Sequence, residues 1–357
     1  MRFHLGFPAP SIIDLKMPDN AALAQLAEAR GFDGLWHSNQ RFFREMFVRM
    51  ASSAMVTERV AIGGAVAEPF AVHPIITAQS LATVDELSGG RATLALGAGG
   101  SGFKMMGIER RRSALALREA YAVISGLLEG REVTFDGEVI QAYKARLAFE
   151  IDEPPLLWVA SRGDLTLETS GEYARGVIIA TYATPSGVRA ALDLVAKGAA
   201  RAGRSMDAIR IISRVDTCVH QDQGAAFDGC REMIANFLFS SYPDRNFVRR
   251  MGLDVPEELE RLIARQDVEL RPQVARMVPD EFVKAFAWAG TPEMVADRIV
   301  EIHRATGIEE YGFWGLLAPG QRREESLQLI ADEVLPRIRS TIESSVSITG
   351  SIEGLGS

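Results

Sequence analysis

The sequence predicts a (β/α)8 TIM barrel, and three observations lead to this fold class. Eight short apolar segments have the composition of buried strands, amphipathic helical patterns lie between them, and the two kinds alternate along the chain. Such alternation implies parallel strands joined by right-handed crossovers, and eight units favour a closed barrel over an open sheet. The predicted strands span residues 2–7, 33–37, 60–67, 92–97, 156–160, 176–181, 209–218 and 311–317.

The segments between these strands predict helices because their apolar residues recur every three to four positions. Gly89 and Gly90 follow the third of these helices and predict a left-handed C-cap, which costs glycine little. The predicted helices span residues 20–30, 44–57, 73–87, 113–129, 163–173, 186–202 and 322–339.

Two stretches depart from the simple repeat. Residues 132–143 alternate around Asp136-Gly137 and predict a hairpin inserted after the fourth helix. Residues 222–305 contain several helical patterns and predict a helical insert between strands seven and eight, on the side where barrel loops shape substrate access. We therefore expect one domain over residues 1–340, followed by a flexible tail, 341–357, that is rich in Ser and Gly.

The composition limits the classes of partner. A net charge of -8 argues against a nucleic-acid surface. No apolar run reaches the roughly 18 residues of a membrane span, and the N-terminus lacks an apolar signal segment, so we expect a cytoplasmic protein without a membrane partner. Cys218 and Cys230 are the two cysteines, and no cluster of metal-ligand spacing accompanies them, so we expect reduced thiols and no metal.

A glycine-rich segment, GAGGSG at residues 97–102, follows the fourth strand. It matches GxGxxG, but a dinucleotide fingerprint opens a helix in the first βαβ unit, whereas three βα units precede this one. We interpret the segment as backbone that can approach an anionic ligand closely through its N–H groups.

A second candidate for anion binding follows the fifth strand. Ser161 is expected to cap the next helix, whose N-terminus together with Arg162 would favour a phosphate. The alternative is an ordinary N-cap beside a solvated arginine. Together the two loops favour an extended anionic ligand.

Four motifs connect these features to a known family. The chain contains TVDELSGGRATLALGAGG, LLEGREVTFDGEVI, WVASRGDLTLETSGEYARGVIIA and GTPEMVADRI, in this order. On these motifs it resembles the bacterial-luciferase-like family of flavin- and deazaflavin-dependent oxidoreductases, in particular the methylenetetrahydromethanopterin reductase branch, which uses coenzyme F420. The resemblance covers residues 1 to about 340.

The resemblance implies F420, or alternatively FMN, as cofactor, and a homodimer as the assembly. It implies that the cofactor ring lies in the barrel mouth, in front of a bulge with a non-proline cis peptide at Ala65-Val66. The residues that it assigns to the cofactor are Gly6, Ala65, Val66, Gly97, Ala98, Gly99, Gly100, Ser161, Arg162, Gly163 and Ala180.

The chain departs from the reductase branch at two places that carry acids there. Gly6 stands where the branch has an acidic residue, and Asn39-Gln40 stands where the family commonly has Asp-His. The candidate catalytic residues are then Glu68, His37 and Asn39, with His73 as a further proton carrier. The alternatives are a solvated loop position for Glu68, a packed strand for His37 and a helix cap for His73.

These features favour one activity and leave others open. The leading hypothesis is an oxidoreductase that transfers a hydride between F420 and a small organic substrate, at a C=C or C=N bond. The alternatives are an FMN-dependent monooxygenase, a flavin-independent NAD(P)H reductase, and a barrel that binds a cofactor without catalysis.

Overall fold

The computed structural model describes residues 1–100 and 102–353, and the chain divides into two compact units. The first unit comprises Met1–Thr181, Ala190–Arg214 and Glu309–Trp314. The second comprises Tyr182–Arg189, Val215–Ile308 and the chain from Gly315 to the end of the described residues. The single domain over residues 1–340 stays a prediction.

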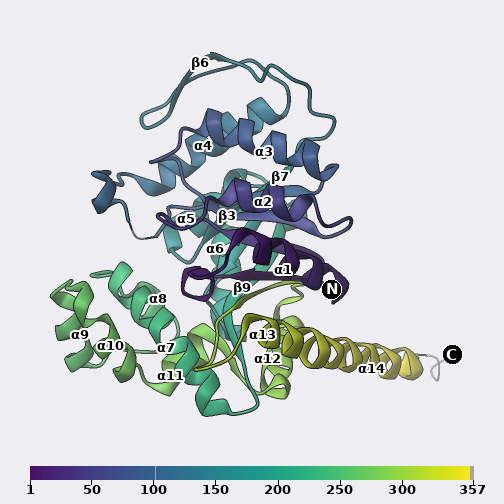
Figure 1. Ribbon diagram of the computed structural model, residues 1–357, viewed down its shortest axis with the longest axis vertical. Helices are drawn as coiled ribbons and strands as arrows, with labels where there is room; N and C mark the ends of the chain where they lie inside the picture. Colours follow the sequence, from purple (N-terminus) through teal and green to yellow (C-terminus); the bar gives the residue numbers. More distant parts are fainter. Residues whose placement is uncertain (101, 354–357) are drawn as a thin grey trace. The chain divides into compact units, whose positions relative to one another are not determined.

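Parallel strands form a closed barrel, as predicted (Figure 1). The strands are neighbours in the order β9-β11-β1-β2-β3-β4-β7-β8, and β8 also pairs with β9, which closes the sheet within the first unit. Each predicted strand is present, with ends that differ by a few residues. The strands are β1 (Arg2–Phe7), β2 (Gly34–Ser38), β3 (Ala61–Ala67), β4 (Ala92–Leu96), β7 (Leu156–Ser161), β8 (Gly176–Ala180), β9 (Arg210–Val219) and β11 (Glu310–Gly315).

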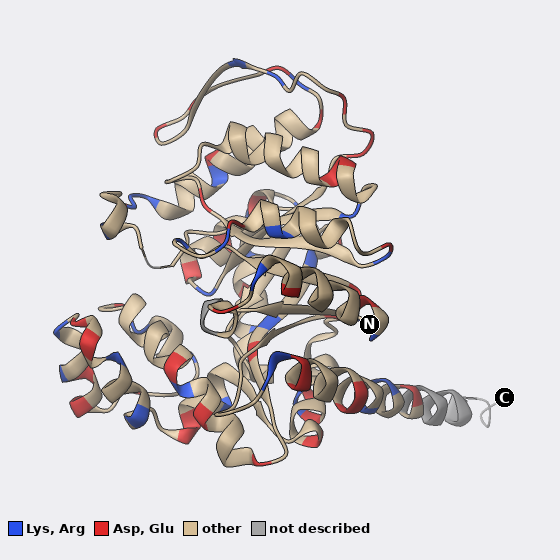
Figure 2. Cartoon of the chain, viewed as in Figure 1, with Lys and Arg blue, Asp and Glu red and all other residues tan. Residues whose placement is uncertain are grey.

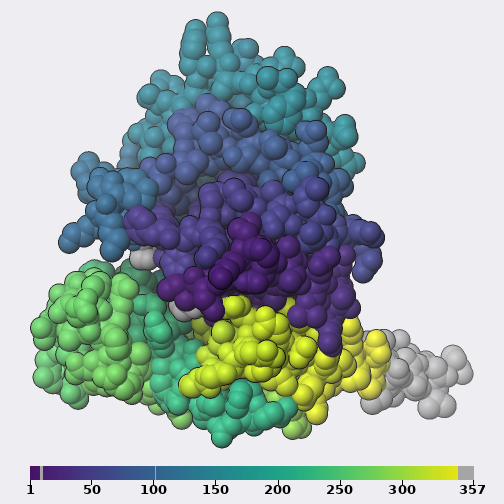
Figure 3. Space-filling model, viewed as in Figure 1, coloured from purple at the N-terminus to yellow at the C-terminus, as the bar shows by residue number. Residues whose placement is uncertain are grey.

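Helices connect the barrel strands where the sequence predicts them. In the space-filling view, α1, α2 and α3 form a continuous layer of side chains on the visible face of the first unit (Figure 3). Gly89 caps α3 with φ 68°, which confirms the predicted left-handed C-cap. The elements are η1 (Ala9–Ile12), α1 (Met17–Ala29), α2 (Met46–Ala54), α3 (Pro74–Ser88), η2 (Lys104–Met106), α4 (Ser113–Leu128), α5 (Asp164–Tyr173), α6 (Pro185–Arg201) and η3 (Met206–Ala208).

Large indoles fill the barrel interior, and strand glycines make room for them. Trp36, Trp158 and Trp314 are buried in one apolar cluster with residues of β4, β8 and β9. A Cβ atom on Gly63 would lie 2.4 Å from Trp36, and one on Gly176 would lie 2.3 Å from Trp158. These two positions therefore accept only glycine while the indoles stay in place.

The predicted hairpin follows α4 as strands β5 (Val133–Asp136) and β6 (Gln141–Ala145), which pair antiparallel. One buried carboxylate anchors its turn. Glu119 of α4 accepts hydrogen bonds from the backbone N–H groups of Glu138, Val139 and Ile140 at 2.9, 2.9 and 2.8 Å. The insert is thus tied to the helix that precedes it.

The second unit contains the predicted helical insert and one strand that the sequence analysis did not predict. This strand, β10 (Ala287–Gly290), pairs parallel with residues 216–219 of β9. It was missed because its four residues directly follow a helix and are too few for a period of two to be recognised. The other elements are α7 (Gln223–Ser240), α8 (Asn246–Arg249), α9 (Glu257–Ala264), η4 (Val268–Leu270), α10 (Arg271–Met277), α11 (Asp280–Phe286) and α12 (Pro292–Thr306).

The C-terminal segment differs from the predicted tail. After α13 (Arg323–Leu329) and the π-helical turn η5 (Ile330–Val334), α14 runs over Leu335–Glu353, whereas we expected the chain to leave the fold at residue 341. Extending an existing helix needs no new nucleus, so the helix can continue without an apolar period. Residues 354–357 of the predicted tail lie outside the described residues. Within the described ranges, no helix combines the length and the apolar character that a membrane span requires.

Candidate functional site

Neighbouring strands bring the predicted cofactor-binding segments to one edge of the barrel. Leu96 of β4 is in register with Val159 of β7, and Ser161 at the end of β7 is in register with Ile179 of β8. Three segments therefore lie at the carboxyl ends of three adjacent strands. They are residues 97–100 after β4 (the glycine loop), residues 161–163 at the end of β7 (the Ser161 loop) and Ala180 at the end of β8. This is the end at which barrel enzymes place their chemistry.

The predicted bulge at the end of β3 is present, with a cis peptide bond between Ala65 and Val66. The register against β4 shifts between Ala65 and Ala67. Asn39 holds both carbonyl groups of the bulge, since its backbone N–H donates to Ala65 O at 3.0 Å and its Nδ2 donates to Val66 O at 3.1 Å. The structure thus places Asn39 beside two predicted cofactor residues.

The local geometry favours glycine at two positions of the loop after β4. The N–H of Gly97 donates to Ala67 O at 3.0 Å, and a Cβ atom on Gly97 would lie 3.0 Å from the Val66 side chain. Gly99 has φ +71°, in the left-handed region that favours glycine. The glycine loop therefore packs directly against the bulge.

The same loop has hydrogen-bond donors that the rest of the described chain does not use. Neither the N–H of Gly99 nor that of Gly100 donates to another residue within the described ranges. Gly100 is exposed, and a Cβ atom there would meet nothing within 4 Å. Successive N–H groups beside open space can bind an anion.

The loop after β7 differs in one respect from the prediction. The N-cap of α5 is Gly163 and not Ser161, because the helix begins at Asp164. Ser161 Oγ instead accepts a hydrogen bond from the Gly163 N–H at 3.0 Å and stabilises the turn before the helix. Arg162 and Gly163 still lie directly before the positive end of the helix.

Glu68 is buried and not a solvated loop residue. Its Oε1 lies 2.7 Å from Arg41 Nη2, and its Oε2 accepts hydrogen bonds from the N–H groups of Phe70 and Ala71 at 2.7 and 3.1 Å. Both carboxylate oxygens are therefore engaged by the protein. These contacts are those of an anchored ion pair, and a role of Glu68 in proton transfer stays a prediction.

His37 takes the position of a packed strand residue. Trp36 points into the barrel, so His37 points outward, where Nδ1 lies 3.0 Å from Gly63 O and Nε2 lies 2.8 Å from Ser53 Oγ. Burial, together with the nearby Arg49 guanidinium, lowers the pKa of His37 to about 3. The ring is neutral with both nitrogens occupied, so the structure gives no support for His37 as a proton carrier.

His73 takes its alternative role as well. It is the N-cap of α3, where Nδ1 accepts a hydrogen bond from the Ile75 N–H at 3.2 Å. Its Nε2 lies 3.0 Å from Gln141 O in the hairpin. Both ring nitrogens of His73 therefore serve the fold.

At Gly6, an acidic side chain has no space. A Cβ atom on Gly6 would lie 2.9 Å from the Trp314 indole, so the position at which the reductase branch carries an acid is closed by this indole.

At the end of β8, Ala180 is in register with Arg214 of β9. Both of these residues belong to the first unit, on the two strands whose pairing closes the barrel.

Three residues beside the glycine loop, Arg41, Phe103 and Arg110, were not among the predicted site residues. Arg41 lies with its guanidinium 3.5 Å from the ring centroid of Phe103, and Arg110 lies 5.0 Å from the same centroid. The Phe103 ring is buried, and it would be 3.0 Å from a Cβ atom on Gly99. The available signal was the cluster of basic residues at 110–112 shortly after the loop.

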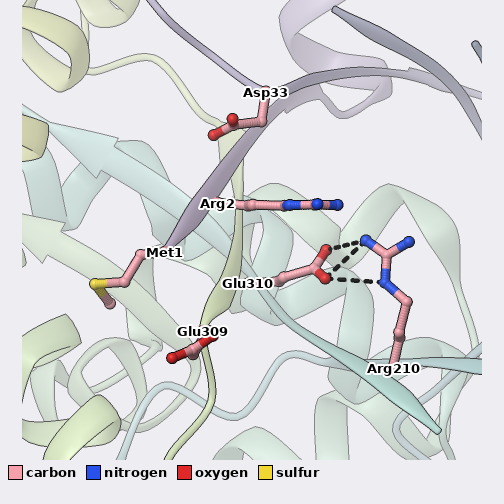
Figure 4. A pocket seen from close by; sticks show the side chains of 6 residues that line it. All are labelled: Met1, Arg2, Asp33, Arg210, Glu309 and Glu310. Atoms are coloured by element: carbon pink, nitrogen blue, oxygen red, sulfur yellow. Dashed lines mark hydrogen bonds and ion pairs between the residues drawn. The ribbon is translucent and has the colours of Figure 1, made fainter. Parts of the chain in front are cut away.

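Two cavities lie at the opposite, amino end of the strands. The first, of about 570 Å³, is lined by Met1, Arg2, Asp33, Arg210, Glu309 and Glu310 (Figure 4). There, Arg210 Nη2 donates to both oxygens of Glu310 at 2.7 and 2.9 Å. The second, of about 1100 Å³, shares Arg2, Asp33 and Arg210 with the first. Arg210 and Glu310 neutralise each other, and barrel enzymes carry out their chemistry at the other end of the strands. We therefore infer that the residues at the amino end stabilise the fold.

Comparisons with known proteins find relatives that match over nearly the whole chain. The chain is 29% identical over 346 residues to 5,10-methylenetetrahydromethanopterin reductase of Archaeoglobus fulgidus, covering 95% of this chain and 100% of that protein. It is 27% identical to F420-dependent glucose-6-phosphate dehydrogenase of Beutenbergia cavernae, covering 90% and 94%. The solved structure of the coenzyme F420-dependent tetrahydromethanopterin reductase of Methanopyrus kandleri matches with a TM-score of 0.80 and 26% identity, covering 94% and 99%.

A match to a family model over most of the chain shows the family to which the protein belongs. The sequence pattern of the luciferase-like monooxygenases matches residues 7–310, which include the bulge, the glycine loop and the Ser161 loop. The chain belongs to the luciferase-like monooxygenase family.

Proposed function

We propose that this protein is an oxidoreductase that transfers a hydride between coenzyme F420 and a small organic substrate. The observation that carries the proposal is the glycine loop, whose Gly99 and Gly100 N–H groups are unused within the described chain and lie at the carboxyl end of β4, with open space beside Gly100. Two relatives that match over nearly their full length are F420-dependent enzymes, and they act on different substrates.

The residues of the site suit a cofactor of this kind. The Gly99 and Gly100 amides would hold the phosphate group, together with the turn at Ser161–Gly163. The bulge at Ala65-Val66, held by Asn39, would support the ring. When bound in its reduced form, the deazaflavin supplies the hydride, and the protein's part is to bind and orient it.

The proton-carrying groups limit the type of substrate. His37 is neutral and fully bonded, Glu68 is paired with Arg41, and Gly6 leaves no acid at that position of β1. Reduction of a strongly polarised bond needs little help from an acid. We therefore propose an activated C=C or C=N bond as the acceptor and not the substrate of the reductase branch.

A fluorescence titration tests the proposal. The purified protein is titrated with oxidised F420 and, separately, with FMN, and quenching of cofactor emission is followed. We expect F420 to bind with a Kd of roughly micromolar order and FMN to bind much more weakly. Preference for FMN would favour the monooxygenase alternative instead, and binding of neither ligand would contradict the proposal.

A variant at Gly100 shows whether the loop is the binding site. A side chain at Gly100 meets only open space in the protein, so Gly100→Val should leave the melting temperature unchanged. It should weaken F420 binding at least about tenfold, because the side chain enters the space proposed for the ligand. A homodimer and a cytoplasmic location stay predictions that these titrations do not address.

A further inference from the structure

The Arg110 guanidinium contacts two carbonyl groups of the glycine loop. Arg110 Nη1 donates to Gly99 O at 2.8 Å and makes a longer contact with Ala98 O at 3.4 Å. Arg110 lies eleven residues further along the chain from Gly99, after η2. The contact therefore joins the start of the segment between β4 and α4 to its end.

This contact determines where the loop amides point. In a trans peptide the C=O and the following N–H lie on opposite sides of the bond. When Arg110 binds the carbonyls of Ala98 and Gly99, the N–H groups of Gly99 and Gly100 are directed away from it. Neither of these two N–H groups donates to another residue in the described ranges.

Arg110 is itself positioned by an aromatic and charged cluster. The Phe103 ring is buried and has the guanidinium of Arg41 3.5 Å from its centroid and that of Arg110 at 5.0 Å. Arg41 is fixed in turn by its ion pair with Glu68 at 2.7 Å. Cation–π contacts of this kind orient a guanidinium without consuming its hydrogen-bond donors.

The charge at this place favours an anion although the whole chain is acidic. Partial burial lowers the pKa of Arg110, the neighbouring Arg41 guanidinium lowers it further, and the Glu68 carboxylate acts in the opposite direction. Glu68 offsets one of the two guanidinium charges through its ion pair with Arg41, so the cluster keeps one positive charge that can attract a ligand anion. Figure 2 shows basic positions where the chain passes from η2 into α4, in agreement with an anion-binding region there.

We propose that Arg110 is a positioning residue for the phosphate group of the cofactor: it holds the glycine loop so that the Gly99 and Gly100 amides face the ligand. The proposal rests on the proposed function. It goes further by separating two parts of the ligand, since Arg110 would act on the phosphate-bearing tail and not on the deazaflavin ring.

The test compares two ligands that differ in the tail. One is F420, and the other is its phosphate-free deazaflavin riboside, which keeps the ring. Arg110→Gln should weaken F420 binding by about tenfold or more, because both loop carbonyls lose a charged donor, and should leave riboside binding within about twofold. The matched control is Arg111→Gln, an exposed neighbour paired with Glu109 at 2.6 Å, which should change neither Kd.

A second variant separates positioning from simple attraction. Arg110→Lys keeps the charge but lacks the planar fork, so it should not restore F420 binding, and the defect should persist at high salt. Full restoration by lysine, or an equal loss for both ligands, overturns the positioning role. Unchanged F420 binding in Arg110→Gln also overturns it. If the wild-type protein binds neither ligand, the proposed function itself fails.

Discussion

At the residue scale, the two neighbours Trp36 and His37 show how one strand directs consecutive side chains to opposite faces of the barrel wall. Side chains alternate across a strand, so the indole enters the barrel and the imidazole meets α2 on the outside. The same alternation places Gly63 opposite the Trp36 indole. A histidine at a strand end is thus a poor sign of catalysis unless its face is known.

The buried His37 predicts a specific dependence of stability on pH. Its folded pKa of about 3 lies below the ordinary value of 6.5, so the unfolded chain binds the proton first as the pH falls. Its contribution to stability is complete above pH 6.5 and is lost progressively below it, at up to about 1.4 kcal/mol for each pH unit.

Urea unfolding at pH 7 and pH 5 measures this effect. We expect the wild type to lose up to roughly 2 kcal/mol more stability over this range than His37→Gln does. Equal pH dependence in the wild type and His37→Gln would show that His37 is not buried as a neutral ring.

At the element scale, the hairpin depends on one carboxylate. Burial raises the pKa of Glu119, but the hydrogen bonds from Ile140, Val139 and Glu138 outweigh it and lower the pKa overall. The anion therefore stabilises the turn above its ordinary pKa, and this stabilisation is lost as the pH falls. The contact joins α4 to a hairpin that sequence analysis could place along the chain but not in space.

Glu119→Gln should loosen the hairpin without unfolding the barrel. An amide oxygen replaces a carboxylate that accepts three N–H groups, which costs about 1 to 3 kcal/mol locally. Hydrogen exchange of residues 138–140 should accelerate, while F420 binding stays unchanged. Glu129→Gln, which removes an exposed ion pair with Arg131, serves as the control. Unaltered exchange at 138–140 would exclude the anchoring role.

At the scale of the whole barrel, its two ends have different tasks. At the amino end, Glu310 of β11 binds His4 of β1 at 3.2 Å and Arg210 of β9 at 2.7 Å, so one carboxylate connects three adjacent strands. Burial raises the pKa of Glu310, and the hydrogen bonds from His4 and Arg210 lower it to a greater extent. The amides proposed for the ligand follow β4 at the carboxyl end.

This separation predicts opposite effects for two variants. Glu310→Gln should lower the free energy of unfolding by about 1 to 3 kcal/mol, because a partly buried charge pair loses one partner, and should leave the F420 Kd unchanged. Gly100→Val should change the Kd and not the stability. Chemical denaturation and fluorescence titration of both variants provide the check. A parallel loss of stability and affinity in either one would contradict the division.

The sequence by itself determined the features that depend on local periodicity and on special residues. Alternation of strands and helices predicted the closed barrel, the Asp136-Gly137 turn predicted the hairpin, and the family motifs predicted the cis bulge at Ala65-Val66. Each of these is encoded within a short segment or in the order of segments along the chain.

Only the tertiary structure decided which distant residues meet. It paired Glu68 with Arg41, placed Asn39 on the bulge carbonyls and brought Arg110 back to the glycine loop. It also showed that the Trp314 indole closes the space at Gly6. The physical reason is that a hydrogen bond or ion pair depends on separation in space, and barrel closure brings together residues whose spacing along the chain follows no period.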